Sequence, residues 1–399
     1  MSDMKWLVSV GAGRWQAPGI RAARAAGLKV LAVDGDENAC GFKMADRALI
    51  ADIRDASAVI KAVERAGLRL DGAIAFCNEA GMLSTALLRE RFNLPCARTS
   101  VTKALTNKGV QRARWTASGL PGPLWSVVRS AGEVPAALAK INGTAIFKPV
   151  DAAGSRGVAV VALGEPWESA FATALKGSYS GEVIIEAFII GIEHTVETFT
   201  SRGVTHVLAI TEKKKVPGTS NTVAYELATA QLDKRGYRDV GEIVTRALNA
   251  LDYTDGPGHT EFLLTPDGQI FLVESAGRGG GFMVADGIVP QTSGFDMARA
   301  CALQAVGLEP DAPKRIISRS VVLRFIPSQP GTVNEIAGFD AQDEINGVTS
   351  EPLVEIGQVV GRATSDGDRM AFILATAGTL DDALLKADMR ERKIKITMA

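Results

Sequence analysis

Two carboxylates on one predicted β-hairpin have the spacing of a divalent-cation site. Residues 259–282 are predicted to form the hairpin, because two apolar runs flank a Pro-Asp-Gly turn. A two-residue turn at Asp267-Gly268 would pair Glu261 directly with Glu274, with Cβ atoms ~5 Å apart on one face of the sheet. Like charges so close repel unless a cation lies between them, and Mg²⁺ accepts hard oxygen ligands. The prediction depends on register, since a three-residue turn would place the carboxylates on opposite faces.

An arginine extends this candidate site. Arg278 follows Glu274 by four residues, in a Gly-rich bend that lets a ligand approach the backbone closely. Two carboxylates, a cation site and an arginine together favour phosphoryl transfer on a nucleotide. The alternative is a surface hairpin with two solvated glutamates.

A Gly/Ala/Ser loop between two predicted strands is a second candidate site. The first strand, residues 145–149, carries Lys148 near its end. In the loop, the backbone N–H groups of Gly154 and Ser155 and the charge of Arg156 could hold an anion. The loop is not a Walker A motif, which requires Gly-Lys-Ser/Thr at the start of a helix. The alternative is an ordinary flexible hairpin.

Charged residues also interrupt apolar strands in the middle of the chain. Glu186 and Glu193 have otherwise apolar neighbours, and a buried glutamate is rare without a partner. The run Lys213–Lys215 is typical of a solvated face, and of its members only Lys213 is retained as a candidate site residue.

The elements that precede these motifs predict a Rossmann-like domain. A strand, a helix and a strand within residues 6–34 form a βαβ unit. Gly11 and Gly13, with Asp34 about 20 residues on, partly match a dinucleotide-binding fingerprint, but Gln16 stands at its third glycine. A tight turn between strand and helix is therefore favoured over an NAD site, and an NAD-dependent oxidoreductase remains the rival from another enzyme class.

Length and composition bound the fold and exclude several classes of partner. The 399 residues suggest two or three domains, and 46% apolar with 22% charged residues fits a soluble globular α/β protein. The net charge of −1, without long charged tracts, gives no support to nucleic-acid or membrane-surface binding. No apolar run approaches the ~18–20 residues of a membrane span. The four scattered cysteines indicate reduced thiols and a cytoplasmic location.

The last quarter of the chain has a β-rich pattern and no chemical motif. Strands are expected at 321–325, 333–336, 354–356 and 371–375, followed by a helix at 380–389. A third, smaller domain is therefore expected.

Together the motifs resemble the ATP-grasp superfamily of carboxylate ligases, and within it the L-amino-acid ligase branch. The resemblance rests on residues 147–158, on 186–193, and on His259-Thr260-Glu261 with 274–281. Each motif alone is modest, whereas their order and spacing together are specific.

The resemblance implies an α/β ATP-grasp fold of three parts. These are a Rossmann-like pre-grasp domain at 1–104, an ATP-grasp domain at 105–308 with its lid at about 120–185, and a C-terminal α+β domain at 309–399. The implied activity joins a carboxylate, an amino acid or related small acid, to an amine through an acyl phosphate, using ATP and Mg²⁺ or Mn²⁺. The acceptor could instead be a purine precursor or a sugar amine. A homodimer is also expected.

The resemblance assigns nucleotide-binding roles to Lys108, Lys148, Gly154, Ser155, Arg156, Glu186, Ala187, Ile189 and Glu193. The lysines would hold phosphates beneath the loop. Glu186 would begin a hinge whose backbone at Ala187 and Ile189 reads adenine, and Glu193 would hold the ribose.

The remaining implied roles lie on the hairpin and the bend. Glu261 and Glu274 would be the metal ligands, Arg278 would steady the acyl phosphate, and Phe282 would shape the substrate pocket. Many relatives have Asn where this chain has Ala276, so a second metal would rest on the two glutamates, phosphate oxygens and water.

Overall fold

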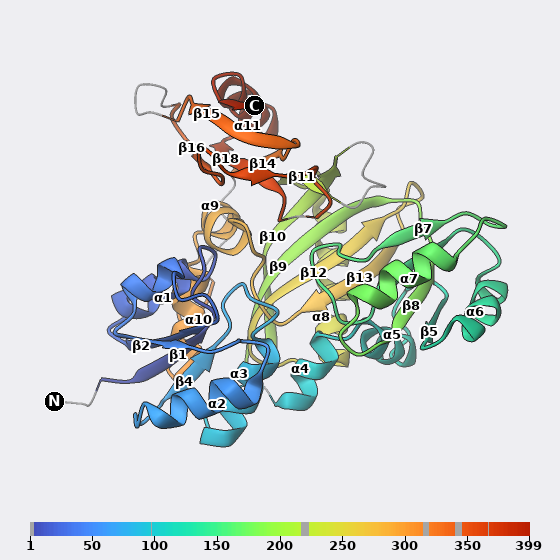
Figure 1. The fold of residues 1–399 in the computed structure, drawn as a ribbon. Helices are drawn as coiled ribbons and strands as arrows, with labels where there is room; N and C mark the ends of the chain where they lie inside the picture. The colour runs from blue at the N-terminus through green and yellow to red at the C-terminus, as the bar shows by residue number, and fades with distance from the viewer. Residues whose placement is uncertain (1–3, 97, 217–222, 314–318, 340–344, 366) are drawn as a thin grey trace.

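The computed structural model describes residues 4–96, 98–216, 223–313, 319–339, 345–365 and 367–399. Figure 1 shows an N-terminal domain in blue, a large sheet in the centre, a green lid on one side of it and a C-terminal region at the top. The α/β fold class expected from the sequence is confirmed.

The N-terminal domain is built on a parallel sheet of order β3-β2-β1-β4. Its elements are β1 (Trp6–Val10), α1 (Ala17–Ala25), β2 (Lys29–Asp34), η1 (Cys40–Met44), β3 (Arg47–Ile50), α2 (Ala56–Arg65), β4 (Gly72–Ile74) and α3 (Met82–Phe92). The central strands β1 and β2 are buried and apolar, as parallel strands covered by helices must be.

The lid is a four-stranded antiparallel sheet of order β5-β8-β6-β7, covered by two helices. It follows α4 (Thr99–Leu105) and α5 (Lys108–Ala117) and contains β5 (Trp125–Val128), η2 (Ala131–Glu133), α6 (Val134–Ile141), β6 (Ala145–Pro149), β7 (Ala159–Val161), α7 (Glu168–Gly177) and β8 (Val183–Ala187). Its own apolar core includes Phe147, Phe171 and Ile185, so the lid packs as a separate unit.

The central sheet is antiparallel, with strand order β13-β12-β9-β10-β11-β14-β18-β16. Its first part comprises β9 (Ile192–Ser201), β10 (Val204–Lys215), β11 (Ala224–Thr229), β12 (Gly256–Leu264) and β13 (Ile270–Ala276). The helix α8 (Lys234–Ala250) buries Val244 and Leu248 against Val196 and Phe262 on one face of this sheet. Because strand side chains alternate, the residues beside them face the opposite side, where the candidate site lies.

The C-terminal region continues this sheet with β14 (Ser320–Pro327), β18 (Arg369–Ala377) and β16 (Val348–Pro352), and α11 (Leu380–Glu391) packs on it. A small second sheet contains β17 (Val359–Val360), β15 (Gly331–Ala337) and β19 (Lys395–Met398). The strand predicted at 354–356 is wrong. Val354 is buried beside Val333, but the N–H of Glu355 bonds to its neighbour Gln358 in a turn.

Between these parts lie η3 (Val284–Ile288), α9 (Val289–Ser293) and α10 (Met297–Ala305). The helix α10 packs against the N-terminal sheet so closely that a Cβ on Gly72 would lie 2.1 Å from the carbonyl oxygen of Ala305. Within the described ranges, no helix has the length and hydropathy to span a bilayer. The domain boundaries remain predictions.

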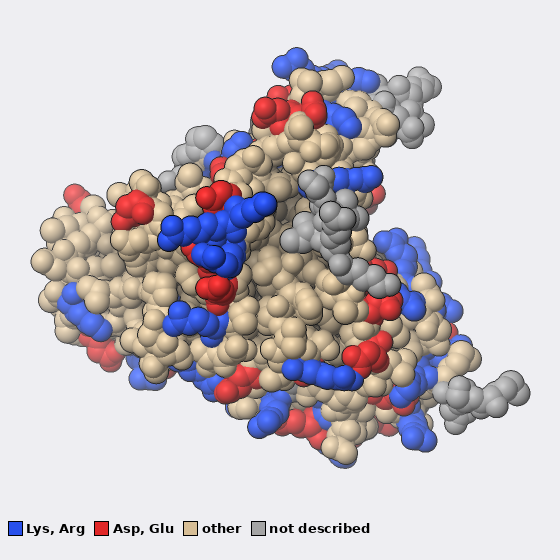
Figure 2. Space-filling view, turned by 180° about the vertical axis from the view of Figure 1, so that it is seen from behind, with Lys and Arg blue, Asp and Glu red and all other residues tan. Residues whose placement is uncertain are grey.

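One face of the molecule carries charges of both signs side by side (Figure 2). On α8, for example, Arg238 lies 3.0 Å from Asp239 and 3.8 Å from Glu242. Such exposed pairs contribute little to stability.

Candidate active site

The hairpin of β12 and β13 pairs Glu261 with Glu274, as predicted, although its turn is longer than predicted. Its turn spans residues 266–268 and is closed by a hydrogen bond from the N–H of Thr265 to the carbonyl of Gln269. This longer turn shifts the register by one residue, and a β-bulge just after Glu261 shifts it back. The predicted two-residue turn is therefore wrong, whereas the shared face of the two carboxylates is observed.

A cavity of about 610 Å³ lies between the lid and the central sheet, large enough for a nucleotide. The predicted site residues that line it are Lys108, Lys148, Gly154, Ser155, Arg156, Glu186, Ala187, Ile189, Glu193, Glu261 and Glu274. Lys213 lines it as well, whereas Arg278 and Phe282 are outside this lining. Segments far apart in the sequence thus converge on one volume.

On the lid side, a buried ion cluster fixes one lysine. Lys148 on β6 lies 2.7 Å from the carboxylate of Glu186 on β8, which also contacts Arg112 of α5. Burial alone would raise the pKa of Glu186, but the two cations outweigh it and lower that pKa to about 2. The carboxylate therefore orients Lys148. Glu186 directly precedes Ala187 at the end of β8, and the hinge expected to begin there remains a prediction.

Arg112 was missed by sequence reasoning, although a signal was available. It lies four residues after Lys108, so both side chains share one face of α5. Its guanidinium also donates to the carbonyl of Val273 at 2.9 Å, which ties the lid cluster to the metal-site hairpin.

On the sheet side, lysines contact the paired carboxylates. Lys108 lies 2.7 Å from Glu274, and Lys213 lies 2.5 Å from both Glu193 and Glu261. Burial would raise the pKa of Glu261, but Lys213 and a histidine hold it well below its usual range. Each metal-ligand candidate thus has a lysine against its carboxylate.

The interpretation of the run Lys213–Lys215 as a solvated face is wrong for Lys215, whereas Lys213 lines the cavity as a retained candidate. Both are mostly buried, and Lys215 lies 2.9 Å from Glu193. Lys214 also lines the cavity, but its ammonium pairs with Glu226. The period of two in a strand was the available signal.

Two oxygen donors on one face fit a hard divalent cation. Among the residues that the structure describes, no cluster of three His, Cys, Asp or Glu side chains could close a site around a metal ion. A cation here would complete its shell with phosphate oxygens and water, which is the arrangement Mg²⁺ prefers.

A second row of polar residues lies behind the paired carboxylates. The Nδ1 atom of His259 contacts Glu197, and its Nε2 lies 3.5 Å from Glu261. Glu197 also accepts the N–H of Gly280 at 3.0 Å. Burial would lower the pKa of His259, but the neighbouring carboxylates raise it to about 9. The row connects the hairpin to the glycine-rich bend.

The loop over the cavity is fixed at its base and open at its tip. The carboxylate of Asp151 accepts the N–H groups of Tyr179 and Ser180, and Lys108 donates to the carbonyl of Ala152 at 2.6 Å. Gly154 and Ser155 follow with φ of +69° and +59°. Arg156 is exposed and bonds only locally, to the carbonyl of Ala153.

The apolar end of the cavity lies where β8 leaves the lid. The N–H of Ala187 bonds to Leu124 and that of Phe188 to Thr144, which fixes the course of the chain toward Ile189. Phe188, Ile190 and Leu263 line this end. A flat, largely apolar group fits there.

Arg278 lies beside the cavity and is paired with a residue that was not predicted. Its guanidinium is 3.0 Å from Glu79, in the loop between β4 and α3, and donates to the carbonyl of Gly279. Burial would lower the pKa of Arg278, but Glu79 and Glu274 raise it. Glu79 also helps to raise the pKa of Lys108, so the pair adjoins the phosphate-side lysine.

The Gly11-x-Gly13 turn has a structural use. Asp34 accepts the N–H groups of Ala12 at 2.7 Å and of Asp36 at 3.0 Å, so both carboxylate oxygens are engaged by backbone. A ribose-binding role for Asp34 finds no support, and the tight-turn interpretation is favoured.

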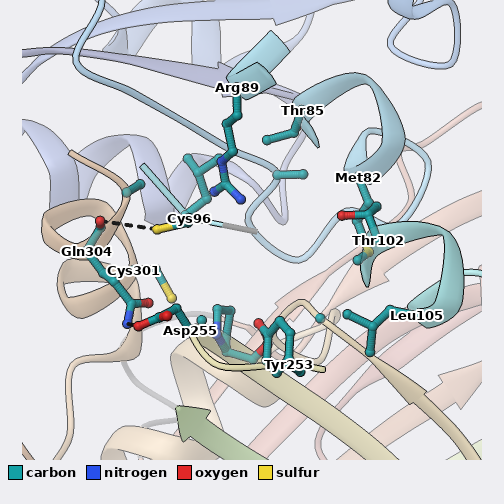
Figure 3. A pocket seen from close by; sticks show the side chains of 16 residues that line it. Met82, Thr85, Arg89, Cys96, Thr102, Leu105, Tyr253, Asp255, Cys301 and Gln304 are labelled. Carbon is teal, nitrogen blue, oxygen red and sulfur yellow. Dashed lines mark hydrogen bonds between the residues drawn. The ribbon is translucent and has the colours of Figure 1, made fainter. Parts of the chain in front are cut away.

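A separate cavity of about 50 Å³ lies between the N-terminal domain and α10 (Figure 3). Arg89 there donates to the carbonyl of Ala73, Gln304 donates to Asp255, and Cys96 donates to the backbone of Gln304. The volume suits one or two waters, and its polar groups serve the junction between domains.

Comparisons with known proteins agree with this geometry. The ATP-grasp domain family matches residues 141–286, and the L-amino acid ligase C-terminal domain 2 matches residues 324–399. An L-arginine-specific L-amino acid ligase of Bacillus subtilis is 23% identical over 73% of this chain and 72% of its own length. An uncharacterized protein y4rH of Sinorhizobium fredii is 25% identical over 91% of this chain and 77% of its own. Matches to two further relatives cover only 46% and 49% of those proteins.

Solved structures show the same fold. An L-amino acid ligase from Bacillus licheniformis has a TM-score of 0.85 at 22% identity, covering 100% of this chain and 99% of that one. A phosphoribosylglycinamide synthetase from Anaerococcus prevotii has a TM-score of 0.79 at 19% identity, covering 100% of both chains. Residues 141–286 therefore match the ATP-grasp domain family, residues 324–399 match the C-terminal domain 2 of the L-amino acid ligases, and the whole chain has the fold of these solved structures.

Proposed function

We propose that this chain activates a small carboxylic acid with ATP and joins it to an amine, releasing ADP and phosphate. The observation that carries the proposal is the pairing of Glu261 with Glu274 in a cavity that also holds Lys108 and Lys148. Paired carboxylates beside two lysines suit a cation bound to a polyphosphate, and they are poorly suited to a neutral ligand.

The nucleotide would occupy the cavity from the lysines to the apolar end. Lys108 and Lys148 would contact phosphates beneath the loop residues Gly154, Ser155 and Arg156. The backbone of Ala187 and Ile189 would read adenine, and Glu193 would hold the ribose. These roles explain why a lysine contacts each acidic group. When ATP binds, its phosphates would replace the carboxylates as the partners of the lysines.

Glu261 and Glu274 would hold Mg²⁺, or Mn²⁺ with the same oxygen ligands. The metal, when bound, supplies charge neutralisation for the transferring phosphoryl group. Thr195, directly opposite Glu261 on β9, completes the polar face from the protein side.

The reaction would proceed in two balanced steps. A carboxylate oxygen attacks the γ-phosphorus, the bond to the bridging oxygen breaks, and ADP leaves with that electron pair. The amine nitrogen then attacks the acyl carbon, the C–O bond to phosphate breaks, and the nitrogen loses a proton. Arg278 would stabilise the oxyanion, and the lid would exclude water that hydrolyses the intermediate.

The Glu79–Arg278 pair supports an α-amino acid as the acid. When a substrate carboxylate takes Arg278, Glu79 loses its partner in a mostly buried site. An α-ammonium group on the substrate would replace that partner, whereas a simple acid would leave the carboxylate uncompensated. The names of the ligases that resemble this chain point the same way.

A purine precursor or a sugar amine is the second candidate for the acceptor. The formate-dependent phosphoribosylglycinamide formyltransferase of Paraburkholderia xenovorans, 31% identical over 50% of this chain, motivates it.

A phosphate-release screen over pairs of carboxylates and amines, with product mass as the readout, tests the proposal. We expect phosphate release that requires ATP, Mg²⁺ and an acid, with a product lighter by one water than its two precursors. ATP turnover that no acid stimulates would contradict the proposal. Sedimentation of the purified chain would test the expected homodimer separately.

A further inference from the structure

The glycine-rich bend that carries Arg278 is held at one residue, Gly280, by two contacts. The Gly280 N–H donates to a carboxylate oxygen of Glu197 on β9 at 3.0 Å, and its carbonyl accepts the thiol of Cys77 at 3.3 Å. The packing is so close that a Cβ on Gly280 would lie 2.8 Å from Glu197 and 2.6 Å from Val284. A side chain at this position would therefore push the bend away from Glu197.

Glu197 is a buried carboxylate whose two oxygens contact two different segments. It is 1% exposed, and it lies directly opposite His259 in the pairing of β9 with β12. One oxygen contacts the Nδ1 atom of His259, and the other accepts the Gly280 N–H. A buried carboxylate is costly unless both oxygens have partners, so these two contacts specify its position. Glu197 therefore joins a strand of the central sheet to the bend.

The two contacts on Gly280 differ in strength. A carboxylate that accepts a backbone N–H makes a charge-assisted hydrogen bond, whereas a thiol is a weak donor. Glu197 also lies on a strand with neighbours on both sides, β10 and β12, whereas Cys77 lies in the loop between β4 and α3. Glu197 is therefore the stronger and better fixed of the two anchors.

The position of Arg278 depends on the course of this bend. It lies two residues before Gly280, and its guanidinium donates to the carbonyl of Gly279. Its charged partner Glu79 belongs to the loop that also carries Cys77. A group that stabilises an oxyanion must stay within hydrogen-bond distance of it, and a misplacement of about 1 Å can lower a rate ~100-fold. The anchor of the bend therefore controls the reach of Arg278.

We propose that Glu197 is a positioning residue for activation of the acid, because it holds the bend at Gly280 so that Arg278 faces the reacting acyl group. The inference rests on the proposed function and adds a residue to it. Glu197 lies outside the lining of the nucleotide cavity, so its effect must reach the reaction through the bend.

A double-mutant cycle between Glu197→Ala and Arg278→Ala tests this role, with kcat/KM for an acid from the phosphate-release screen as the readout. Glu197→Ala alone should lower that kcat/KM roughly 100-fold. Once Arg278 is absent, the position of the bend matters little to the reaction. The double variant should therefore be at most about threefold worse than Arg278→Ala, whereas a purely structural role would multiply the two losses.

Binding of ADP supplies a readout that does not depend on the reaction. The affinity of Glu197→Ala for ADP, measured by calorimetry, should stay within about threefold of the wild type, because the bend lies outside the nucleotide cavity. A general loss of structure would instead lower ADP affinity and kcat/KM for the acid together.

Conservative variants keep the test decisive if Glu197→Ala does not fold. Glu197→Asp keeps the charge beside His259 but is one CH₂ group too short to reach Gly280 as well. It should also lower kcat/KM for the acid and show the same non-additivity with Arg278→Ala. Glu197→Gln keeps the length and an oxygen that can accept the Gly280 N–H, so its kcat/KM should lie within about tenfold of the wild type.

Glu226→Gln is the matched control for loss of a buried negative charge. Glu226 is also 1% exposed, but it pairs with Arg324 on β14 and not with the bend. The variant should therefore leave kcat/KM for the acid within about threefold of the wild type.

Four outcomes would overturn the inference. These are losses in Glu197→Ala or Glu197→Asp that multiply with that of Arg278→Ala, an equal loss of ADP affinity, a Glu197→Gln variant no better than Glu197→Asp, and an equal loss in Glu226→Gln. Each would leave the ligase activity of the wild type standing and refute only the positioning role. Wild-type protein that releases no phosphate in response to any acid would contradict the proposed function itself.

Discussion

The two halves of the candidate site differ in how they are built. The nucleotide half is a charged cavity in which Lys108, Lys148 and Lys213 face carboxylates from neighbouring strands. The acid half is a single ion pair, Arg278 with Glu79, on a bend that is held through its backbone. The first half draws on residues 108–274, from α5, the lid and the central sheet, and the second also draws on a loop of the N-terminal domain.

This difference separates binding of the nucleotide from the positioning of one side chain. Charges that act on a polyphosphate must stand at fixed places on strands, and their spacing is therefore visible in the sequence. The acid half depends on one arginine on a bend, and contacts from distant segments fix that bend. Variants in the charged half should therefore impair turnover of ATP, and variants in the acid half should impair use of the acid while ADP still binds.

The largest effect is expected for Glu274→Gln. The amide keeps the shape of the side chain and removes one charge from the metal site, so ADP release should fall at least ~1,000-fold. The melting temperature should change little. Glu242→Gln, at an exposed position on α8, is the matched control. An unchanged rate of ADP release in Glu274→Gln would contradict the assignment of Glu274 as a metal ligand.

Arg278→Ala should impair the acid half of the site and leave the nucleotide half largely unaffected. We expect kcat/KM for the acid to fall roughly 100–1,000-fold, as for loss of one oxyanion donor. ADP affinity, measured by calorimetry, should stay within about threefold, because Arg278 lies outside the nucleotide cavity. Equal losses of acid activation and ADP binding would contradict the assignment of Arg278 to the acid half.

Lys213→Gln should have a smaller effect, confined to the nucleotide half. Its ammonium lies between Glu193 and Glu261, so its loss should raise the KM for ATP by roughly tenfold. Lys214→Gln, on the opposite face of β10, is the control and should leave that KM unchanged. If both variants behave alike, the interpretation of this run as a solvated face regains support.

The smallest effect concerns stability at acid pH. Glu186 has its pKa lowered to about 2 in the folded protein, against 4.5 for a free side chain. Its contribution, about 3 kcal/mol, is therefore complete above pH 4.5 and is lost as the pH falls toward 2. The melting temperature of the wild type should fall more steeply between pH 5 and pH 3 than that of Glu186→Gln, with pH limits chosen to span this interval. Parallel profiles would show that Glu186 does not titrate in this range.

Sequence patterns predicted most of the nucleotide half. The pairing of Glu261 with Glu274 was predicted from the alternation of side chains in strands. The predicted turn length was wrong, but the pairing is still observed because a β-bulge compensates for the longer turn. Lys213 was retained as a candidate, but Lys215 was assigned to a solvated charge run, although the alternation of side chains in a strand places both in the cavity. Arg112 was overlooked because it lies within a helix and belongs to no sequence motif.

The acid half was much less visible. Glu79 lies in the loop before α3, where no sequence motif marks its contact with Arg278. Glu197 and Cys77 are far apart in the chain and meet only at the backbone of Gly280. No local periodicity encodes such a meeting, so these residues could be found only from the structure.

Transfer of ¹⁸O from a labelled carboxylate tests the central claim most directly. With an acid identified in the screen and labelled in both carboxylate oxygens, the acyl-phosphate route carries one ¹⁸O into the released phosphate and leaves one in the amide. We predict phosphate with one ¹⁸O atom per molecule of product, detected by mass spectrometry. Unlabelled phosphate released together with the amide product would contradict activation of the carboxylate by the γ-phosphoryl group.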